Sequence, residues 1–149
     1  MKMKLLTLLL APLCAFTLQA GTPAQDKEFC DKYKAAFEKG DKAALESFLY
    51  TKDANPMALE FFKMMMTGEA GGKISKIELV DLTPEDAKKA MEVQTGPDGS
   101  KAQLPLKATK KLKITVETKD ANGSSSSSSE NFVAESDGKY VIPVPAKVK

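Results

Sequence analysis

Residues 106–144 read LKATKKLKITVETKDANGSSSSSSENFVAESDGKYVIPV, and this stretch decides the fold of the chain. From residue 104 onward, apolar and polar residues alternate with a period of two, which is typical of a long strand with one buried face. The apolar face is expected to contain Leu104, Leu106, Ala108, Leu112, Ile114 and Val116. This alternation predicts that a sheet dominates the C-terminal half.

Lys110 interrupts the alternation, because it falls on the apolar face of the predicted strand. We expect a β-bulge or a bend at this position, which would turn the lysine outward. The alternative is a functional lysine kept inside a pocket, although a single ionisable group is weak evidence for a site.

Six consecutive serines, Ser124–Ser129, belong either to a second strand or to a flexible linker. A three-residue loop at 121–123, with Gly123 in the left-handed conformation, would start a strand that pairs Leu112 with Phe132. The weak strand propensity of serine favours the linker instead.

A second predicted three-residue loop, at residues 136–138, would pair Phe132 with Ile142 and Ala134 with Tyr140. Both loops therefore place Phe132 on the apolar face. The two predicted turns thus agree on which residues face the core, and a flexible linker would not require this agreement. We therefore expect the serines to form the outer end of a β-hairpin.

Helices are expected in the first half of the chain, at residues 24–40, 41–50 and 55–68. The first has an apolar face at helical spacing and ends at a glycine, and the other two begin at the capping residues Asp41 and Asn55. The run FFKMMM is rich in soft sulfur ligands, but consecutive helical residues point about 100° apart, so a copper site is not expected. Residues 73–82 then predict a strand, residues 84–89 a helical turn, and residues 96–99 the turn of a hairpin.

The first 20 residues have the layout of a secretory signal peptide, with Lys2 and Lys4 before an apolar run too short to span a membrane. Cleavage is expected after Ala20, with Ala24 as a weaker alternative. Cys14 would be the lipidated residue of a lipoprotein, but the bulky Leu13 before it disfavours that interpretation. We therefore expect a secreted or periplasmic protein.

Charge and composition exclude several functions. The chain has 22 basic and 20 acidic residues, so loss of Lys2 and Lys4 with the signal peptide leaves 20 of each. A neutral chain without arginine does not suit nucleic-acid binding. Without histidine, neither a Ser-His-Asp nor a Cys-His catalytic arrangement can form, and no metal or cofactor motif is present. Cys30 is expected to be a partly buried apolar residue, with an intermolecular disulfide as the alternative.

The order of elements and the closing sequence FVAESDGKYVIPV, residues 132–144, resemble the nuclear-transport-factor-2-like superfamily, and especially its small exported bacterial members. Ketosteroid isomerases are one branch of these cone-shaped folds. The resemblance implies one α+β domain at residues 21–149, with N-terminal helices packed on one face of a curved, mainly antiparallel sheet. The helical turn at 84–89 is an addition, and the Asp/His/Tyr residues of the enzymatic branches have no match, so no catalytic residue is assigned.

Three functions remain open. The first is an exported noncatalytic domain that binds a small apolar ligand or an envelope protein between helices and sheet. The residues expected to line its pocket are Tyr33, Phe37, Met65, Lys110 and Tyr140. The second is an acid–base enzyme that pairs Asp31 or Glu38 with Tyr33 or Tyr140. The third is a structural protein that forms a homo-oligomer through a sheet edge or Cys30. An empty apolar pocket would favour the first, and a buried carboxylate in it the second.

Overall fold

The computed structural model describes residues 21–96 and 98–148, so the predicted signal peptide and its cleavage after Ala20 lie outside the described residues. The chain is an α+β protein, as the sequence predicts. Its helices are α1 (Pro23–Glu38), α2 (Lys42–Glu46), α3 (Pro56–Thr67) and α4 (Pro84–Met91). No helix in the described part of the chain is long and apolar enough to cross a membrane.

The main sheet has five strands in the order β1-β7-β6-β5-β2, all antiparallel except for the parallel pair of β1 and β7. The strands are β1 (Leu49–Tyr50), β2 (Lys73–Asp81), β5 (Ala108–Asp120), β6 (Gly123–Ser136) and β7 (Lys139–Pro143). A small second sheet has the order β3-β4-β8, formed by β3 (Gln94–Thr95), β4 (Lys101–Gln103) and β8 (Ala146–Lys147). The expected hairpin around residues 96–99 is the β3–β4 pair of this sheet.

Two predicted boundaries are wrong by four residues, and the others differ by two residues or fewer. The second helix ends at Glu46 rather than at residue 50, because Leu49 and Tyr50 pair with Ile142 and Pro143 as strand β1. The long strand begins at Ala108 rather than at residue 104, since the intervening segment contains a proline, which cannot donate a ladder hydrogen bond.

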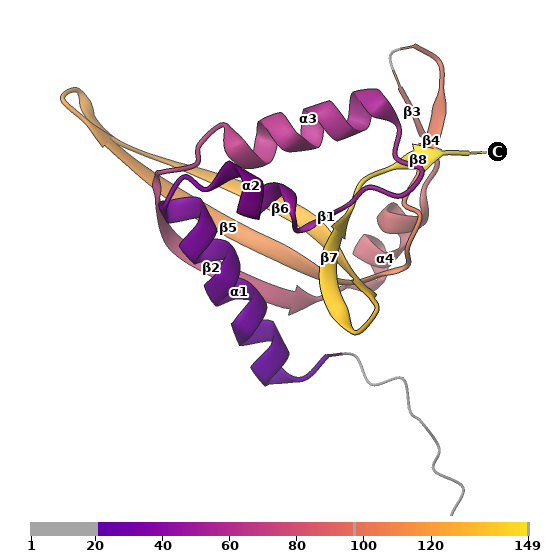
Figure 1. Ribbon diagram of the computed structural model, residues 1–149, viewed down its shortest axis with the longest axis horizontal. Coiled ribbons are helices and arrows are strands. Elements are labelled where there is room, and N and C mark those ends of the chain that lie inside the picture. The colour runs from indigo at the N-terminus through magenta and orange to yellow at the C-terminus, as the bar shows by residue number, and fades with distance from the viewer. Residues whose placement is uncertain (1–20, 97, 149) are drawn as a thin grey trace, which may run out of the picture.

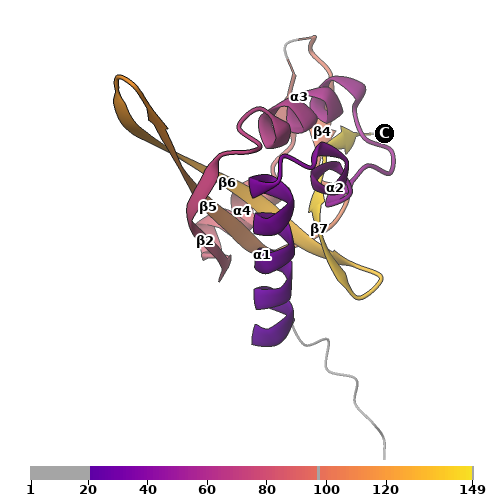
Figure 2. The same ribbon diagram turned by 60° about the vertical axis from the view of Figure 1, so that its left-hand side comes forward.

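The serines form the first half of β6, so the predicted strand is confirmed and the linker is wrong. Figure 1 shows the β5–β6 hairpin projecting beyond the helices, and Figure 2 shows α1 lying across the sheet at its base. The serine side chains are exposed, and Ser127 Oγ donates to Glu69 after the end of α3. The tip of the hairpin therefore needs little apolar surface.

Both predicted hairpin registers are wrong by one residue. The first turn contains two residues, because Asp120 pairs with Gly123, and Leu112 consequently pairs with Asn131 instead of Phe132. The second turn also contains two residues, because Ser136 pairs with Lys139. Its central Asp137 and Gly138 both have positive φ, which is the requirement of the two-residue type I′ turn.

The register places Phe132 on the sheet face opposite the core, paired with Lys111. The predicted packing of Phe132 against Ile142 is therefore wrong. Asn131 and Val133 face the helices instead. The core contains apolar residues from α1, α2, β1, α3 and the sheet, namely Phe29, Tyr33, Ala36, Phe37, Leu45, Leu49, Met66, Ile74, Leu112, Ile114, Val116, Val133, Ile142 and Val144.

A β-bulge is present at the position where the sequence predicts one, between Ala108 and Lys110. The predicted effect on the lysine is wrong, however. Lys110 stays on the helix-facing side of the sheet, and its side chain is only 8% exposed. The bulge changes the local register without turning Lys110 to solvent, because its ammonium group has acidic partners on that side.

Candidate functional site

Three aromatic side chains, Phe29, Tyr33 and Phe37, lie along one face of α1 at intervals of four residues and are buried against the sheet. Thr22 caps the start of α1 and Asp41 caps the start of α2, since each side chain accepts a backbone N–H from the first turn of its helix. The ring of Tyr33 stacks on Phe37 with centroids 6.4 Å apart. Phe29 contacts Tyr140 edge to face at 5.7 Å. This row lies between two pockets.

The first pocket, which we call the α3 pocket, has a volume of about 350 Å³ and lies between α1, α3 and the base of the β5–β6 hairpin. Its walls are mainly apolar. They consist of Tyr33, Phe37, Met64, Met65, Met66, Gly68, Glu69, Ile114, Val116, Ser127, Ser128, Ser129 and Asn131. A volume near the lower end of the usual range for small-molecule sites, together with apolar walls, suits a compact organic ligand.

Two polar side chains of the α3 pocket are almost fully buried, with Tyr33 2% and Asn131 7% exposed. Within residues 21–96 and 98–148, neither the Tyr33 hydroxyl nor the Asn131 carboxamide makes a hydrogen bond. The one fully enclosed side-chain polar atom without a partner in these ranges is Thr109 Oγ1. The Tyr33 hydroxyl and the Asn131 carboxamide also lack a partner in the described part of the chain, so they would belong to the same class if they were fully enclosed. Both groups therefore keep some accessible surface. Both residues border the α3 pocket.

Burial raises the pKa of Tyr33 to about 12, so its hydroxyl stays protonated at neutral pH and remains a hydrogen-bond donor. The Asn131 carboxamide adds two donors and an acceptor without charge. Glu69 is the acidic residue of the lining, but its carboxylate is exposed and already accepts from Ser127. The α3 pocket thus offers neutral hydrogen-bonding groups within apolar walls.

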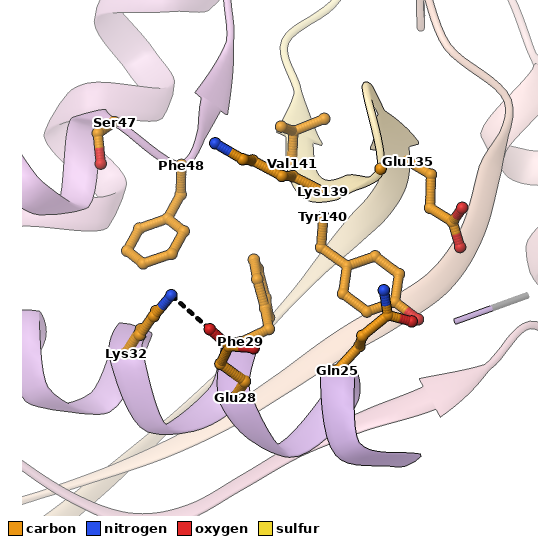
Figure 3. Close-up of a pocket in the computed structure, with 11 residues that line it drawn as sticks. Gln25, Glu28, Phe29, Lys32, Ser47, Phe48, Glu135, Lys139, Tyr140 and Val141 are labelled. Atoms are coloured by element: carbon orange, nitrogen blue, oxygen red, sulfur yellow. Dashed lines mark hydrogen bonds and ion pairs between the residues drawn. The ribbon is translucent and has the colours of Figure 1, made fainter. Parts of the chain in front are cut away.

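The second pocket, which we call the α1–β7 pocket, has a volume of about 400 Å³ and charged residues at its rim. Figure 3 shows the rings of Phe29, Phe48 and Tyr140 around it, with the ion pair of Lys32 and Glu28 at its edge. Its remaining lining is Gln25, Ser47, Glu135, Gly138, Lys139 and Val141. Glu28 and Lys32 are each more than half exposed, so their ion pair lies at the solvent side of this pocket.

A cluster of charged residues lies beside Tyr140. The Tyr140 hydroxyl donates to Asp26 Oδ1 at 2.7 Å, and Lys110 Nζ donates to Asp26 Oδ2 at 2.8 Å and to Asp81 Oδ1 at 3.0 Å. Burial acts to lower the pKa of Lys110, but its hydrogen bonds to the two aspartates outweigh it and raise the pKa overall. The carboxylate of Asp26 is thus committed to two donors, which is the arrangement of a structural ion pair.

The five predicted pocket residues do not line a single pocket. Tyr33, Phe37 and Met65 line the α3 pocket, and Tyr140 lines the α1–β7 pocket. Lys110 lines neither of these pockets, and it joins the cluster with Asp26.

The acids proposed for an enzyme do not contact a tyrosine hydroxyl among the described residues. Asp31 is exposed and forms an ion pair with Lys27, while Glu38 accepts the backbone N–H of Ile74 at 3.2 Å. The thiol of Cys30 is half-buried, and burial together with nearby Asp26 raises its pKa, so the reactive thiolate is disfavoured.

Sequence reasoning missed Asn131 as a pocket residue and Asp26 as the partner of Tyr140. Asn131 follows from the correct hairpin register, and the positive-φ turn preference of Asp137-Gly138 was the available signal for it. Asp26 is one helical turn before Phe29 and Cys30, so it lies near the same face of α1 as the aromatic row. No group of three or more His, Cys, Asp or Glu suited to a metal ion occurs in the described ranges.

No protein-family model matches the chain, and no curated protein sequence matches it. Among solved structures, a designed nuclear-transport-factor-2-like protein is similar to this chain, with 10% sequence identity and a TM-score of 0.36. The match covers 82% of this chain and 95% of that protein. A TM-score this low carries no argument about family or function. The α+β description therefore rests on the chain's own elements and strand pairings.

Proposed function

We propose that this chain is an exported, noncatalytic domain of the nuclear-transport-factor-2-like kind, which binds a small neutral ligand in the α3 pocket. The observation that carries the proposal is the pair of nearly buried polar groups on Tyr33 and Asn131 that have no partner among the described residues. Both groups keep accessible surface in the pocket, so a ligand oxygen would replace their contact with solvent by a direct hydrogen bond. Such an exchange contributes about 0.5–1.5 kcal/mol net.

The ligand class follows from the charges around the α3 pocket. No lysine of the described ranges lines it, so an anionic head group would lose its hydration without an opposite charge in return. A cation would find only the exposed carboxylate of Glu69 in this lining. The best match is a compact apolar molecule with one carbonyl or hydroxyl oxygen, because Tyr33 and Asn131 can both donate to it.

Acetophenone and ethylbenzene form a matched pair of probes, since they are similar in size and differ by the carbonyl oxygen. Wild-type protein should bind acetophenone about 3–10-fold more tightly, which corresponds to one net hydrogen bond. Tyr33→Phe should reduce this preference without weakening ethylbenzene binding, since Asn131 remains as a donor. Affinities can be measured by titration monitored by two-dimensional NMR.

Tyr50→Phe is the control, because Tyr50 lines neither pocket and its substitution should leave both affinities unchanged. Equal binding of the two probes to wild-type protein, or the same preference in Tyr33→Phe, would contradict the assignment of the oxygen-binding group. An absence of binding by both probes would contradict the proposed pocket itself.

The predicted export of the chain agrees with the proposed role in binding a small ligand. The charged start and apolar run before Ala20 are those of a signal peptide, and Leu13 disfavours lipidation of Cys14. A protein released outside the cytoplasm meets small organic molecules that an apolar pocket can hold. Intact-mass analysis of the exported protein should give an N-terminus at Gly21, whereas an acylated Cys14 would establish the lipoprotein alternative.

A further inference from the structure

The backbone nitrogen of Gly21 lies against the β6–β7 hairpin, although the two are far apart in sequence. It donates to Glu135 Oε1 at 3.0 Å. The next residue, Thr22, is the N-cap of α1 and forms a reciprocal capping box with Gln25. The start of α1 is therefore held at two places, by its own cap and by the carboxylate of a distant strand.

Gly21 fits this position because it has no side chain. A Cβ atom built on Gly21 would lie 2.6 Å from Tyr140 Cζ and closer still to the hydroxyl oxygen. Tyr140 cannot easily move away, since its hydroxyl donates to Asp26 and its ring contacts Phe29. The backbone of Gly21 thus lies close to the hydroxyl end of Tyr140, next to Glu135.

We propose that Gly21 is the docked amino terminus of the processed protein, and that its ammonium group forms an ion pair with Glu135 which fastens α1 to the β6–β7 hairpin. This inference rests on the proposed cleavage after Ala20. Hydrolysis of that bond by a signal peptidase adds the hydroxyl of water to the Ala20 carbonyl carbon, which becomes a carboxylate. The Gly21 nitrogen keeps the electron pair of the broken bond and takes up protons to become an ammonium group.

Processing therefore changes the strength of an existing contact. Before cleavage, the Gly21 N–H is an amide donor to Glu135. After cleavage, the donor carries a full positive charge, so the attraction between opposite charges is added to the hydrogen bond that the Glu135 carboxylate already accepts. The processed chain gains stability that the precursor lacks, so α1 is more firmly fixed after export than before it.

Glu135 of β6 and Tyr140 of β7 lie next to Gly21. Hydrogen bonds connect Tyr140 to Asp26 of α1, Asp26 to Lys110 of β5, and Lys110 to Asp81 of β2, so these are the further titratable groups linked to the contact. The pKa of Tyr140 is raised by burial and by its hydrogen bond to Asp26, and the pKa of Lys110 is also raised. Both therefore keep their protons when the pH rises through the range in which an amino terminus titrates.

The sign of the pH dependence follows from the partner. A free amino terminus has a pKa of about 8, and the Glu135 carboxylate raises the pKa of the folded-state ammonium above that value. Its stabilisation is fully present below about pH 8 and is lost as the pH rises through the raised value. This loss of stabilisation at alkaline pH is thus expected only when the Gly21 amine is free and its partner at position 135 is a carboxylate.

The test compares protein 21–149 that has a free Gly21 amine with the same protein acetylated at that amine. At pH 7 the free form should melt about 2 °C or more higher, and at pH 10.5 the difference should disappear. Glu135→Gln should remove the difference at pH 7. Equal melting temperatures of the two wild-type forms at pH 7 would overturn the ion pair, as would a difference that persists in Glu135→Gln.

The position of signal-peptide cleavage is determined separately, from the intact mass of the exported protein. An N-terminus at Gly21 supports the proposal, and cleavage after Ala24 would overturn it, whatever the melting temperatures show. Gly21→Ala is a steric control, because its methyl group would displace Tyr140 and should lower the melting temperature at both pH values. These outcomes do not depend on acetophenone binding, so a failure of the ligand proposal is distinguishable from a failure of this one.

Discussion

Val133→Lys should destabilise the protein by about 3–5 kcal/mol, since it places an uncompensated charge in the core. Val133 is fully buried and pairs with Lys110 across β5 and β6, so the new ammonium group would face a second positive charge. A loss of this size is a large part of the roughly 5–15 kcal/mol that stabilises a typical domain. Urea unfolding followed by circular dichroism measures it.

Ser126→Lys is the matched control for this prediction. It introduces the same side chain on the same strand, at an exposed position opposite Glu117, and should change the free energy of unfolding by less than about 0.5 kcal/mol, a typical surface effect. The register with three-residue loops would turn Val133 to the outer face of the sheet. Equal urea midpoints for Val133→Lys and Ser126→Lys would therefore contradict the strand register of the structure.

Lys110→Met should also cost about 2–3 kcal/mol, because it leaves the partly buried Asp26 carboxylate, 21% exposed, without its charged partner. Asp26 would keep its charge and its bond from Tyr140 but lose the ammonium group 2.8 Å away. Methionine fills a similar volume, so the loss of charge rather than a cavity dominates. The contribution of Asp81 is small, since its side chain is 85% exposed.

A double variant separates the charge effect from packing. Lys110→Met combined with Asp26→Asn leaves only the exposed Asp81 carboxylate unpaired, and the amide oxygen of the introduced asparagine can still accept from Tyr140. It should regain at least half of the stability lost in Lys110→Met. If Lys110→Met alone melts like the wild-type protein, the lysine does not stabilise the start of α1, and a role other than structural would have to be sought for it.

The local features of the fold were predictable, because their causes are local in the sequence. Capping residues and prolines mark the starts of α1, α3 and α4, and the structure contains their hydrogen bonds. The alternation before Asp120 is a property of one strand and predicts β5 without knowledge of its partners. The serines were assigned to a strand because two turns flank them at compatible spacing.

The register of β6 was not predictable from parity alone. Shifting both turns from three residues to two preserves the consistency between them, so the alternation supports either choice until a turn conformation decides. With three-residue turns Phe132 faces the core, whereas with the observed two-residue turns Asn131 and Val133 face it. The three-residue loop was chosen for Gly123 in the left-handed conformation, and that choice placed Phe132 on the core face.

The α3 pocket was partly predictable for the same reasons. Tyr33 and Phe37 share one face of a helix, so the spacing on α1 places them together. Met65 joins them through the packing of α3 against the sheet, and Tyr140 is directed to the other pocket by the turn before it. Lys110 was singled out by its position on an apolar face, but its acidic partners lie 84 and 29 residues away in sequence.

The methionine methyl groups test the binding proposal most directly. Protein 21–149 has five methionines, of which Met64, Met65 and Met66 line the α3 pocket, whereas Met57 and Met91 are exposed outside it. With carbon-13-labelled methyl groups, acetophenone should shift the signals of Met64, Met65 and Met66 and saturate at one molecule per chain. Shifts confined to Met57 and Met91, or no shift in any of the five, would contradict a ligand site between α3 and the sheet.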